Sequence, residues 1–247
     1  MRIDKFICDT INITRTQAKN KISSGNVFVN GSAVKSSSLQ INENVDEVCV
    51  DGNMLTYRKY VYIMMNKPEG VLSATSDKTC KTAIDLLNDE DKRHDLFIAG
   101  RLDKNTTGFL LITNDGDFAH SILSPKKHIY KTYFVTLKYD DFSGYADMFS
   151  KGIVIDGGYK CKPAELFGVE KNTCYLKISE GKFHQIKRMF STLGNEVVAL
   201  HRVAMGDLQL DNSLKPGEYR YLSAKELDYF LCKTTKNDPL TISRSEN

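Results

Sequence analysis

Apolar positions in residues 1–50 change from a helical to a strand-like spacing. Between residues 3 and 11 they recur every three or four positions, and Thr14 with Gln17 forms a capping-box pattern that starts a second helix. Gly25 ends this helix, and residues 27–34 alternate around an Asn-Gly pair, which is typical of a hairpin. The pattern predicts two short helices followed by a small sheet.

Residues beyond 60 contain longer strand-like runs and few helices. Strands are predicted at 60–65, 96–99, 109–113, 131–137 and 174–178. A helix is predicted over Phe183–Leu193, with Phe183 on its buried face and Gly194 just past its end. Strands and helices do not alternate regularly. The chain is therefore predicted to be α+β, with a small N-terminal α/β domain and a larger domain on a mixed or antiparallel sheet.

The composition fits a folded chain of two unequal domains. Of 247 residues, 41% are hydrophobic and 26% are charged, which excludes a disordered protein. We expect a domain over residues 1–58, a second over 59–232, and a polar tail over 233–247. Six scattered cysteines without a C-x-x-C pair, a charged N-terminus and the absence of a membrane-length apolar run predict a soluble, cytoplasmic protein that binds no membrane.

The net charge of +3 is concentrated at the start of the chain. Residues 1–40 hold six basic and two acidic side chains, among them Lys5, Arg15 and Lys19. Arg15 and Lys19 are four positions apart, so they share a helix face and are spaced to contact neighbouring phosphates. An ordinary solvated helix face would carry the same charges, and charge alone does not separate the two interpretations.

Familiar cofactor and metal motifs are missing. The sequence contains no G-x-G-x-x-G after a strand and no complete P-loop. Residues 103–108 resemble the start of a calcium loop, but its twelfth position is Asn114 instead of the required Glu. We therefore expect neither a metal nor an organic cofactor, and the chemistry falls to protein side chains.

Three polar clusters are candidate sites. The first is the loop around Asp103, which lies between glycines and between two apolar strands, although a turn aspartate that caps local N–H groups would look the same. The second is residues 179–190, where His184, Lys187 and Arg188 are predicted to share the polar face of a helix. The third is residues 125–133, where basic residues alternate with tyrosines, as in a nucleic-acid surface or a lysine-rich edge strand.

Taken together, these clusters resemble the motifs of the pseudouridine synthases. Residues 100–116, Gly-Arg-Leu-Asp-x-x-Thr-x-Gly-x-Leu-x-x-Thr-Asn-Asp-Gly, are similar to the catalytic motif of that family, and residues 131–133 and 180–189 are similar to two further active-site motifs. Residues 66–70, Asn-Lys-Pro-x-Gly, match its entry motif. The N-terminal segment resembles the S4 RNA-binding domain, and the resemblance, over about residues 1–231, is greatest to the small-ribosomal-subunit type.

This resemblance assigns roles to individual residues. It implies that Asp103 is the catalytic carboxylate, acting as a nucleophile or as a base, that Tyr133 stacks on the flipped uracil, and that Lys187 pairs with Asp103. Contacts to RNA or substrate are expected from eight basic residues: Arg101, Lys131, His184, Arg188, Arg202, Arg15, Lys19 and Lys5.

The resemblance also implies a substrate. It points to isomerisation of one uridine, of the uridine-516 type, in 16S rRNA within a partly assembled small ribosomal subunit, by a monomer without cofactors. The alternatives are a 23S rRNA synthase of the same superfamily and a non-catalytic S4-type RNA-binding protein in ribosome assembly. A hydrolase would need a second acid near Asp103; Asp115 and Asp117 are nearby in sequence, but helix capping accounts for them.

Overall fold

The structure is a computed structural model that describes residues 1–92, 95–124 and 129–235. Its internal contacts divide the chain into two compact units. One contains Met1–Val61 and Leu87–Leu96, and the other contains Tyr62–Leu86 and Phe97–Asn247. The domain limits expected at residues 58 and 232 remain predictions. None of the helices in the described residues is long and apolar enough to cross a membrane.

The N-terminal unit confirms the predicted two helices and small sheet. Its elements are α1 (Ile3–Ile11), α2 (Arg15–Ser23), β1 (Val27–Val29), β2 (Ser32–Ala33), β3 (Val48–Val50) and β4 (Asn53–Leu55). The strands pair antiparallel in the order β2-β1-β3-β4. Thr14 caps α2 with the predicted capping box, in which its hydroxyl accepts from Gln17 N and the Gln17 side chain accepts from Thr14 N.

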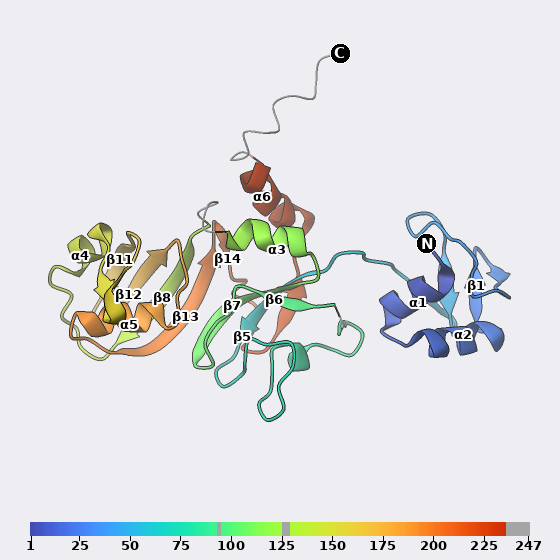
Figure 1. The fold of residues 1–247 in the computed structure, drawn as a ribbon, viewed down its shortest axis with the longest axis horizontal. Helices are drawn as coiled ribbons and strands as arrows, with labels where there is room; N and C mark the ends of the chain where they lie inside the picture. The colour runs from blue at the N-terminus through green and yellow to red at the C-terminus, as the bar shows by residue number, and fades with distance from the viewer. Residues whose placement is uncertain (93–94, 125–128, 236–247) are drawn as a thin grey trace, which may run out of the picture. The chain divides into compact units, whose positions relative to one another are not determined.

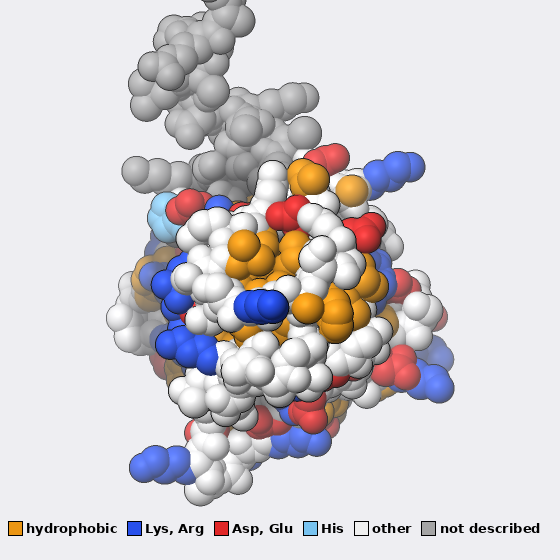
Figure 2. Space-filling view, turned by 90° about the vertical axis from the view of Figure 1, so that its right-hand side faces the viewer, with side chains coloured by type: hydrophobic (Ala, Val, Ile, Leu, Met, Phe, Trp, Pro, Cys, Tyr) orange, Lys and Arg blue, Asp and Glu red, His pale blue; other side chains and the backbone are white. Residues whose placement is uncertain are grey.

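The two faces of this small sheet differ. Val27 and Val50 are paired and buried among the apolar residues of α1 and α2. Phe28, Cys49 and Met54 form a row on the opposite face, where Phe28 is 38% and Met54 is 59% exposed. Figure 2 shows hydrophobic side chains gathered in the middle of the face that it presents. The sheet therefore has one face in the core and a partly apolar face in solvent.

The larger unit is built on a nine-stranded mixed sheet (Figure 1). Seven strands follow one another in the order β11-β12-β8-β13-β7-β5-β15, while β6 pairs with β7 and β14 with β13. Among the strand pairs of this sheet in the described residues, only β13 with β7 is parallel. The α+β prediction is confirmed. The strands are β5 (Tyr62–Lys67), β6 (Phe97–Ala99), β7 (Thr106–Thr113), β8 (Lys131–Leu137), β11 (Glu165–Glu170), β12 (Thr173–Ile178), β13 (Val197–Met205), β14 (Leu208–Gln209) and β15 (Tyr219–Tyr221).

Helices pack at both ends of this sheet. The remaining elements are α3 (Gly116–Leu123), α4 (Tyr145–Lys151), α5 (Gln185–Thr192), α6 (Ala224–Thr235), the 3-10 turns η1 (Ile84–Leu86) and η2 (Asp156–Gly158), and the short pair β9 (Val154–Ile155) and β10 (Tyr159–Lys160). Phe118 of α3 and Phe230 of α6 bury their rings with Phe109 of β7. Phe149 of α4 packs on Phe190 of α5 at the other end (Figure 1). Asp115 caps α3, since its carboxylate accepts from Phe118 N at 3.0 Å.

Two predicted elements differ from the structure. The helix expected over Phe183–Leu193 begins at Gln185, because His184 has a left-handed backbone with φ of 49°. Phe183 therefore precedes the helix and is 75% exposed instead of buried. Helix α6 continues to Thr235, so the expected tail is helical over its first three residues, and the rest of it lies outside the described residues.

The parallel pairing of β7 with β13 depends on Gly108. Its φ is +99°, and a Cβ there would lie 2.4 Å from the carbonyl oxygen of Arg202 and 2.8 Å from its nitrogen. No real Cβ contact is that short, and both partners are backbone atoms that cannot move without separating the strands. Glycine is therefore required where β7 leaves the loop that carries Asp103.

We expect Gly108→Ala to lower the free energy of unfolding by more than about 2 kcal/mol, because the new Cβ collides with backbone in a left-handed conformation. Urea unfolding followed by circular dichroism measures the change. Gly116→Ala is the matched control. A Cβ at Gly116 meets nothing within 4 Å, and the substitution should leave stability unchanged or raise it by about 0.5 kcal/mol. Equal effects of the two substitutions would contradict the packing described here.

Candidate active site

The three predicted motifs meet at one cavity of about 610 Å³. Its walls are the loop between β6 and β7, strand β8, and the segment that leads into α5. Five of the predicted site residues line it: Arg101, Asp103, Tyr133, His184 and Lys187. The structure therefore brings together the three residues expected to be catalytic, although they are up to 84 positions apart in the sequence.

Asp103 is the carboxylate at the centre of this cavity, and its side chain is 31% exposed. A tight turn fixes its position, since Thr106 N donates to the Asp103 carbonyl at 3.0 Å. The residue that the structure places beside Asp103 is His184. His184 Nε2 lies 3.7 Å from Asp103 Oδ2, whereas the described residues include no ion pair between Lys187 and Asp103. The left-handed backbone of His184 turns its ring toward Asp103, and Lys187 lies one helical turn further along the cavity wall.

Lys67 is a buried cation beneath the Asp103 loop. It is fully buried at the end of β5, and its Nζ donates to the carbonyls of Pro68 at 3.0 Å, Lys104 at 3.1 Å and Thr106 at 2.8 Å. Burial lowers the pKa of Lys67 to about 8, while the negative charge of Asp103 acts in the opposite direction and favours the ammonium. Three acceptors match the three N–H groups of an ammonium. Lys67 therefore holds the part of the loop that follows Asp103 in the sequence.

Arg202 was expected to contact RNA, whereas in the structure its side chain bonds the protein itself. It is 1% exposed, its Nε donates to the Phe109 carbonyl at 2.7 Å, and its Nη2 donates to the Gly100 carbonyl at 2.6 Å. A guanidinium with these partners is part of the support of the loop. Together with Lys67 it binds backbone carbonyls before and after Asp103, so the loop is fixed from below by two buried cations.

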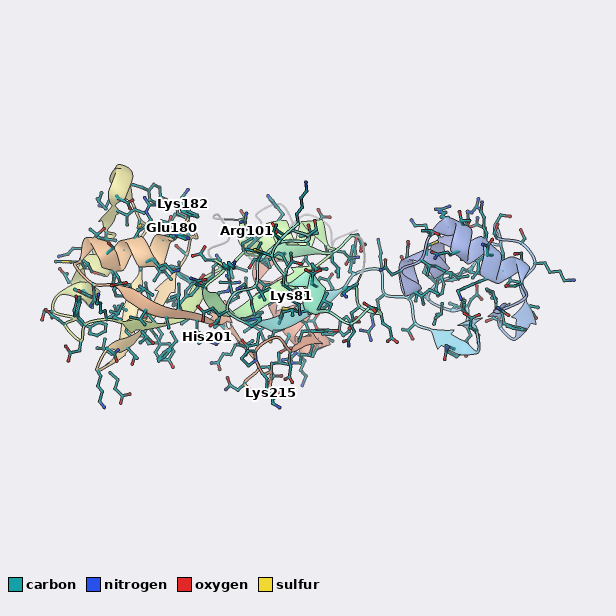
Figure 3. All side chains as sticks on the ribbon, turned by 90° about the horizontal axis from the view of Figure 1, so that it is seen from below. Lys81, Arg101, Glu180, Lys182, His201 and Lys215 are labelled. Carbon is teal, nitrogen blue, oxygen red and sulfur yellow. The ribbon has the colours of Figure 1, made fainter. Side chains whose placement is uncertain are left out.

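The opposite wall is organised by a buried carboxylate. Glu180 is 9% exposed and accepts hydrogen bonds from Lys162 N at 2.9 Å, Gln185 Nε2 at 2.7 Å and Tyr159 Oη at 2.8 Å. Gln185 in turn accepts from Lys182 N at 2.9 Å. These bonds fix both ends of residues 181–184, and Figure 3 shows Glu180 and Lys182 together at this segment, with Arg101 on the same side of the unit.

Phe183 lies in the middle of that segment. Its exposed ring lines the cavity and stacks on the ring of His184, with centroids 3.8 Å apart and planes 20° from parallel. The residue that the helical period assigned to the core is thus an aromatic surface at the cavity.

Two further predicted RNA contacts lie away from the cavity. Lys131 is 8% exposed at the start of β8, and its Nζ donates to the Ile129 carbonyl at 3.4 Å. Burial lowers the pKa of Lys131 to about 8, and its contact with RNA stays a prediction. The Arg188 guanidinium donates to the carboxylate of Asp156 and to the Asp156 backbone carbonyl. Arg188 is not among the residues that line the cavity.

In the N-terminal unit the predicted RNA-binding side chains are exposed. Lys5 and Lys19 face solvent, and the Arg15 side chain is 57% exposed at 3.7 Å from the buried carboxylate of Asp4. Asp4 is mainly held by Arg2, which donates two hydrogen bonds at 3.0 and 2.8 Å and lowers the pKa of that carboxyl. The contacts of these residues with RNA stay predictions.

The third predicted cluster is only partly described. Residues 125–128 lie outside the described residues. Tyr130 is 42% exposed, with Lys177 Nζ 5.0 Å from its ring centroid, and Tyr133 is 7% exposed in the cavity wall.

The cavity offers one carboxylate for chemistry. Asp77 also lines it, but its Oδ1 accepts from Thr79 N at 2.9 Å and from Cys80 N at 2.8 Å, which is local turn capping. Asp115 caps α3 and accepts from Tyr62 Oη at 2.6 Å. The residues that the structure describes include no group of three or more His, Cys, Asp or Glu arranged to hold a metal ion. A single carboxylate beside a tyrosine ring and several cations suits group transfer on a nucleoside better than two-acid hydrolysis.

Comparison with known proteins decides the family. The model of RNA pseudouridylate synthases matches residues 61–192, and that of the S4 domain matches residues 1–46. The chain belongs to the RNA pseudouridylate synthases. This synthase is 45% identical over 232 residues to an uncharacterized RNA pseudouridine synthase of Bacillus subtilis, with 92% of this chain and 97% of the relative covered.

Two further relatives cover both units of the synthase. It is 44% identical over 230 residues to the ribosomal small subunit pseudouridine synthase A of Vibrio cholerae, and the match covers 92% of this chain and 98% of the other. A crystal structure of a pseudouridylate synthase matches with a TM-score of 0.67 and 41% identity, over 93% of this chain and 99% of that one. The predicted family and enzyme class are confirmed.

Sequence reasoning missed the support of the synthase site. Lys67 and Glu180 were noted only within motifs, and Arg202 was assigned to RNA. The available signal was their position. Lys67 comes two residues after the apolar run 60–65, and Glu180 comes two residues after the alternating strand 174–178, and a charged residue so close to a buried strand is expected to be paired.

Proposed function

We propose that this synthase isomerises one uridine of small-subunit rRNA, of the uridine-516 type, within a partly assembled small ribosomal subunit. The Vibrio cholerae relative named as a small-subunit enzyme matches over both units of the chain, which supports the substrate. The observation that carries the proposal is the single carboxylate of Asp103, presented in a cavity by a loop with buried support.

The reaction breaks the C1′–N1 bond, turns the uracil, and joins C5 to C1′, while C5 loses a proton and N1 gains one. Asp103 acts on the sugar or base as a nucleophile or as the base that starts the elimination. Tyr133 stacks on the uracil, Lys187 supplies positive charge to the same cavity, and His184 offers a ring nitrogen beside Asp103. Because the detached base is itself the acceptor, no second carboxylate is needed to position water.

The uridine must leave its helix to reach Asp103, which costs a few kcal/mol. Arg101 is exposed at the start of the loop and is placed to fill the vacated position. The S4 unit offsets this cost by binding flanking RNA through Lys5, Arg15 and Lys19.

We expect Asp103→Asn to lower the single-turnover rate of pseudouridine formation on small-subunit rRNA by at least about a thousandfold, with RNA affinity within about twofold of wild type. Asn keeps the size of the side chain and removes its charge and nucleophilicity. Asp77→Asn is the matched control, because Asp77 lines the same cavity but its carboxylate only caps a turn. Near-normal turnover by Asp103→Asn would refute the proposal.

Replacing Lys5, Arg15 and Lys19 together with Ala should make RNA binding less sensitive to salt. Loss of three phosphate contacts reduces the slope of log K against log [salt] by about two units. Fluorescence anisotropy with labelled rRNA between low and moderate salt measures the slope. A control with Lys138→Ala and Lys151→Ala, whose ammonium groups pair with Glu196 and Asp147, should keep it. An unchanged slope in the triple variant would show that the N-terminal charges are only solvated.

A further inference from the structure

The hydroxyl of Thr106 is buried without a hydrogen-bond partner. Thr106 is 2% exposed, and among the residues that the structure describes its Oγ1 is the one buried side-chain nitrogen or oxygen with no partner. The next residue shows the usual arrangement, since Thr107 Oγ1 lies 2.8 Å from His201 Nδ1. A buried hydroxyl without a partner destabilises the free protein and therefore calls for an explanation.

The backbone of Thr106 is fixed on both sides. Its nitrogen donates to the Asp103 carbonyl at 3.0 Å, and its carbonyl accepts from Lys67 Nζ at 2.8 Å. The hydrogen bond between Thr106 N and the Asp103 carbonyl closes a turn, which keeps the Cα atoms of Asp103 and Thr106 within about 7 Å of each other. Threonine is also stiff at χ1, so little freedom remains for its hydroxyl to find another protein partner.

Thr106 lines the same cavity as Asp103. Other polar groups in the lining already serve the protein. Ser73 Oγ accepts from Leu102 N at 3.1 Å, Asp77 caps a turn, and Gln185 bonds Glu180 and Lys182. The unused hydroxyl thus belongs to a residue that is three positions from Asp103 and lines the same cavity.

We propose that Thr106 Oγ1 hydrogen-bonds an oxygen of the extruded uridine next to its glycosidic bond. Asp103 acts on this nucleoside. Its ring oxygen O4′ is bonded to C1′ itself but is a weak hydrogen-bond acceptor, and the good hydrogen-bonding oxygens closest to the C1′–N1 bond are the ribose 2′-hydroxyl and the uracil O2. A hydroxyl both donates and accepts, so it suits either one. The contact forms only when the substrate is bound, which accounts for a polar group that the free enzyme leaves unpaired. The proposal rests on the isomerisation activity and not on which uridine is the target.

The test compares Thr106→Val, Thr106→Ala and Thr106→Ser on the uridine that the wild-type enzyme is first shown to modify in rRNA. Val and Ala lack the hydroxyl, and both should slow single-turnover pseudouridine formation by about tenfold or more. Ser keeps the hydroxyl and should stay within about threefold of wild type. Thr106→Val should also unfold at the same or a higher urea concentration, because it removes an unsatisfied group.

Thr107→Val is the control, in which stability and not turnover is expected to fall. It leaves His201 Nδ1 without its partner, so it should lower the urea midpoint while turnover is preserved. Repeating the Thr106 comparison on rRNA with 2′-deoxyuridine at the target identifies the atom. The effect of Thr106→Val disappears there if the partner is the 2′-hydroxyl and persists if it is the uracil. Wild-type turnover by Thr106→Val and Thr106→Ala on the normal RNA would overturn the proposal.

Discussion

Two buried cations hold the loop that carries Asp103, the carboxylate that we propose to be catalytic. Lys67 from β5 and Arg202 from β13 donate to the carbonyls of Gly100, Lys104 and Thr106, on both sides of Asp103. Burying an ammonium and a guanidinium is costly unless their hydrogen-bonding groups are satisfied. Here backbone carbonyls of the loop, of Pro68 and of the first half of β7 satisfy them. The loop conformation and the two cations therefore depend on each other.

On the other wall of the cavity, the buried charged group is an anion whose acceptors are also satisfied by the chain. Across the cavity, the buried carboxylate of Glu180 accepts three hydrogen bonds and fixes the segment that presents Phe183 and His184. Each wall is thus positioned by buried charged groups that bond to the chain, while Asp103 and its neighbours remain available to substrate. In the proposed reaction, such preorganisation leaves binding energy free to extrude and orient the base.

The sequence predicted the class of fold and the centre of the site. Asp103, Tyr133 and Lys187 could be found because they belong to motifs with fixed spacing, and all three line the cavity. The errors concern burial. Phe183 has the spacing of a helix core residue, but periodicity does not reveal that a left-handed His184 delays the start of α5. The supporting role of Arg202 also depends on strand register, which pairs it with Gly108 and which no local pattern contains.

Charge type alone does not show whether a basic side chain contacts RNA or the protein itself. Lys131, Arg188 and Arg202 look like RNA-binding residues, yet two are buried and the third pairs with Asp156. The partner of Asp103 in the structure is His184 instead of Lys187, because helix geometry fixes the direction of each side chain only once the helix start is known. In this chain, motifs identify the residues of the site, but the contacts of their side chains can be assigned only from the structure.

The central claim is that this chain, through Asp103, converts one uridine of small-subunit rRNA. Mapping pseudouridine at nucleotide resolution in both rRNAs of a strain that lacks the gene tests it most directly. We predict that one pseudouridine disappears from the small-subunit rRNA, that the wild-type gene restores it, and that the Asp103→Asn gene does not. An unchanged set of pseudouridines, or a loss confined to the large-subunit rRNA, would contradict the account.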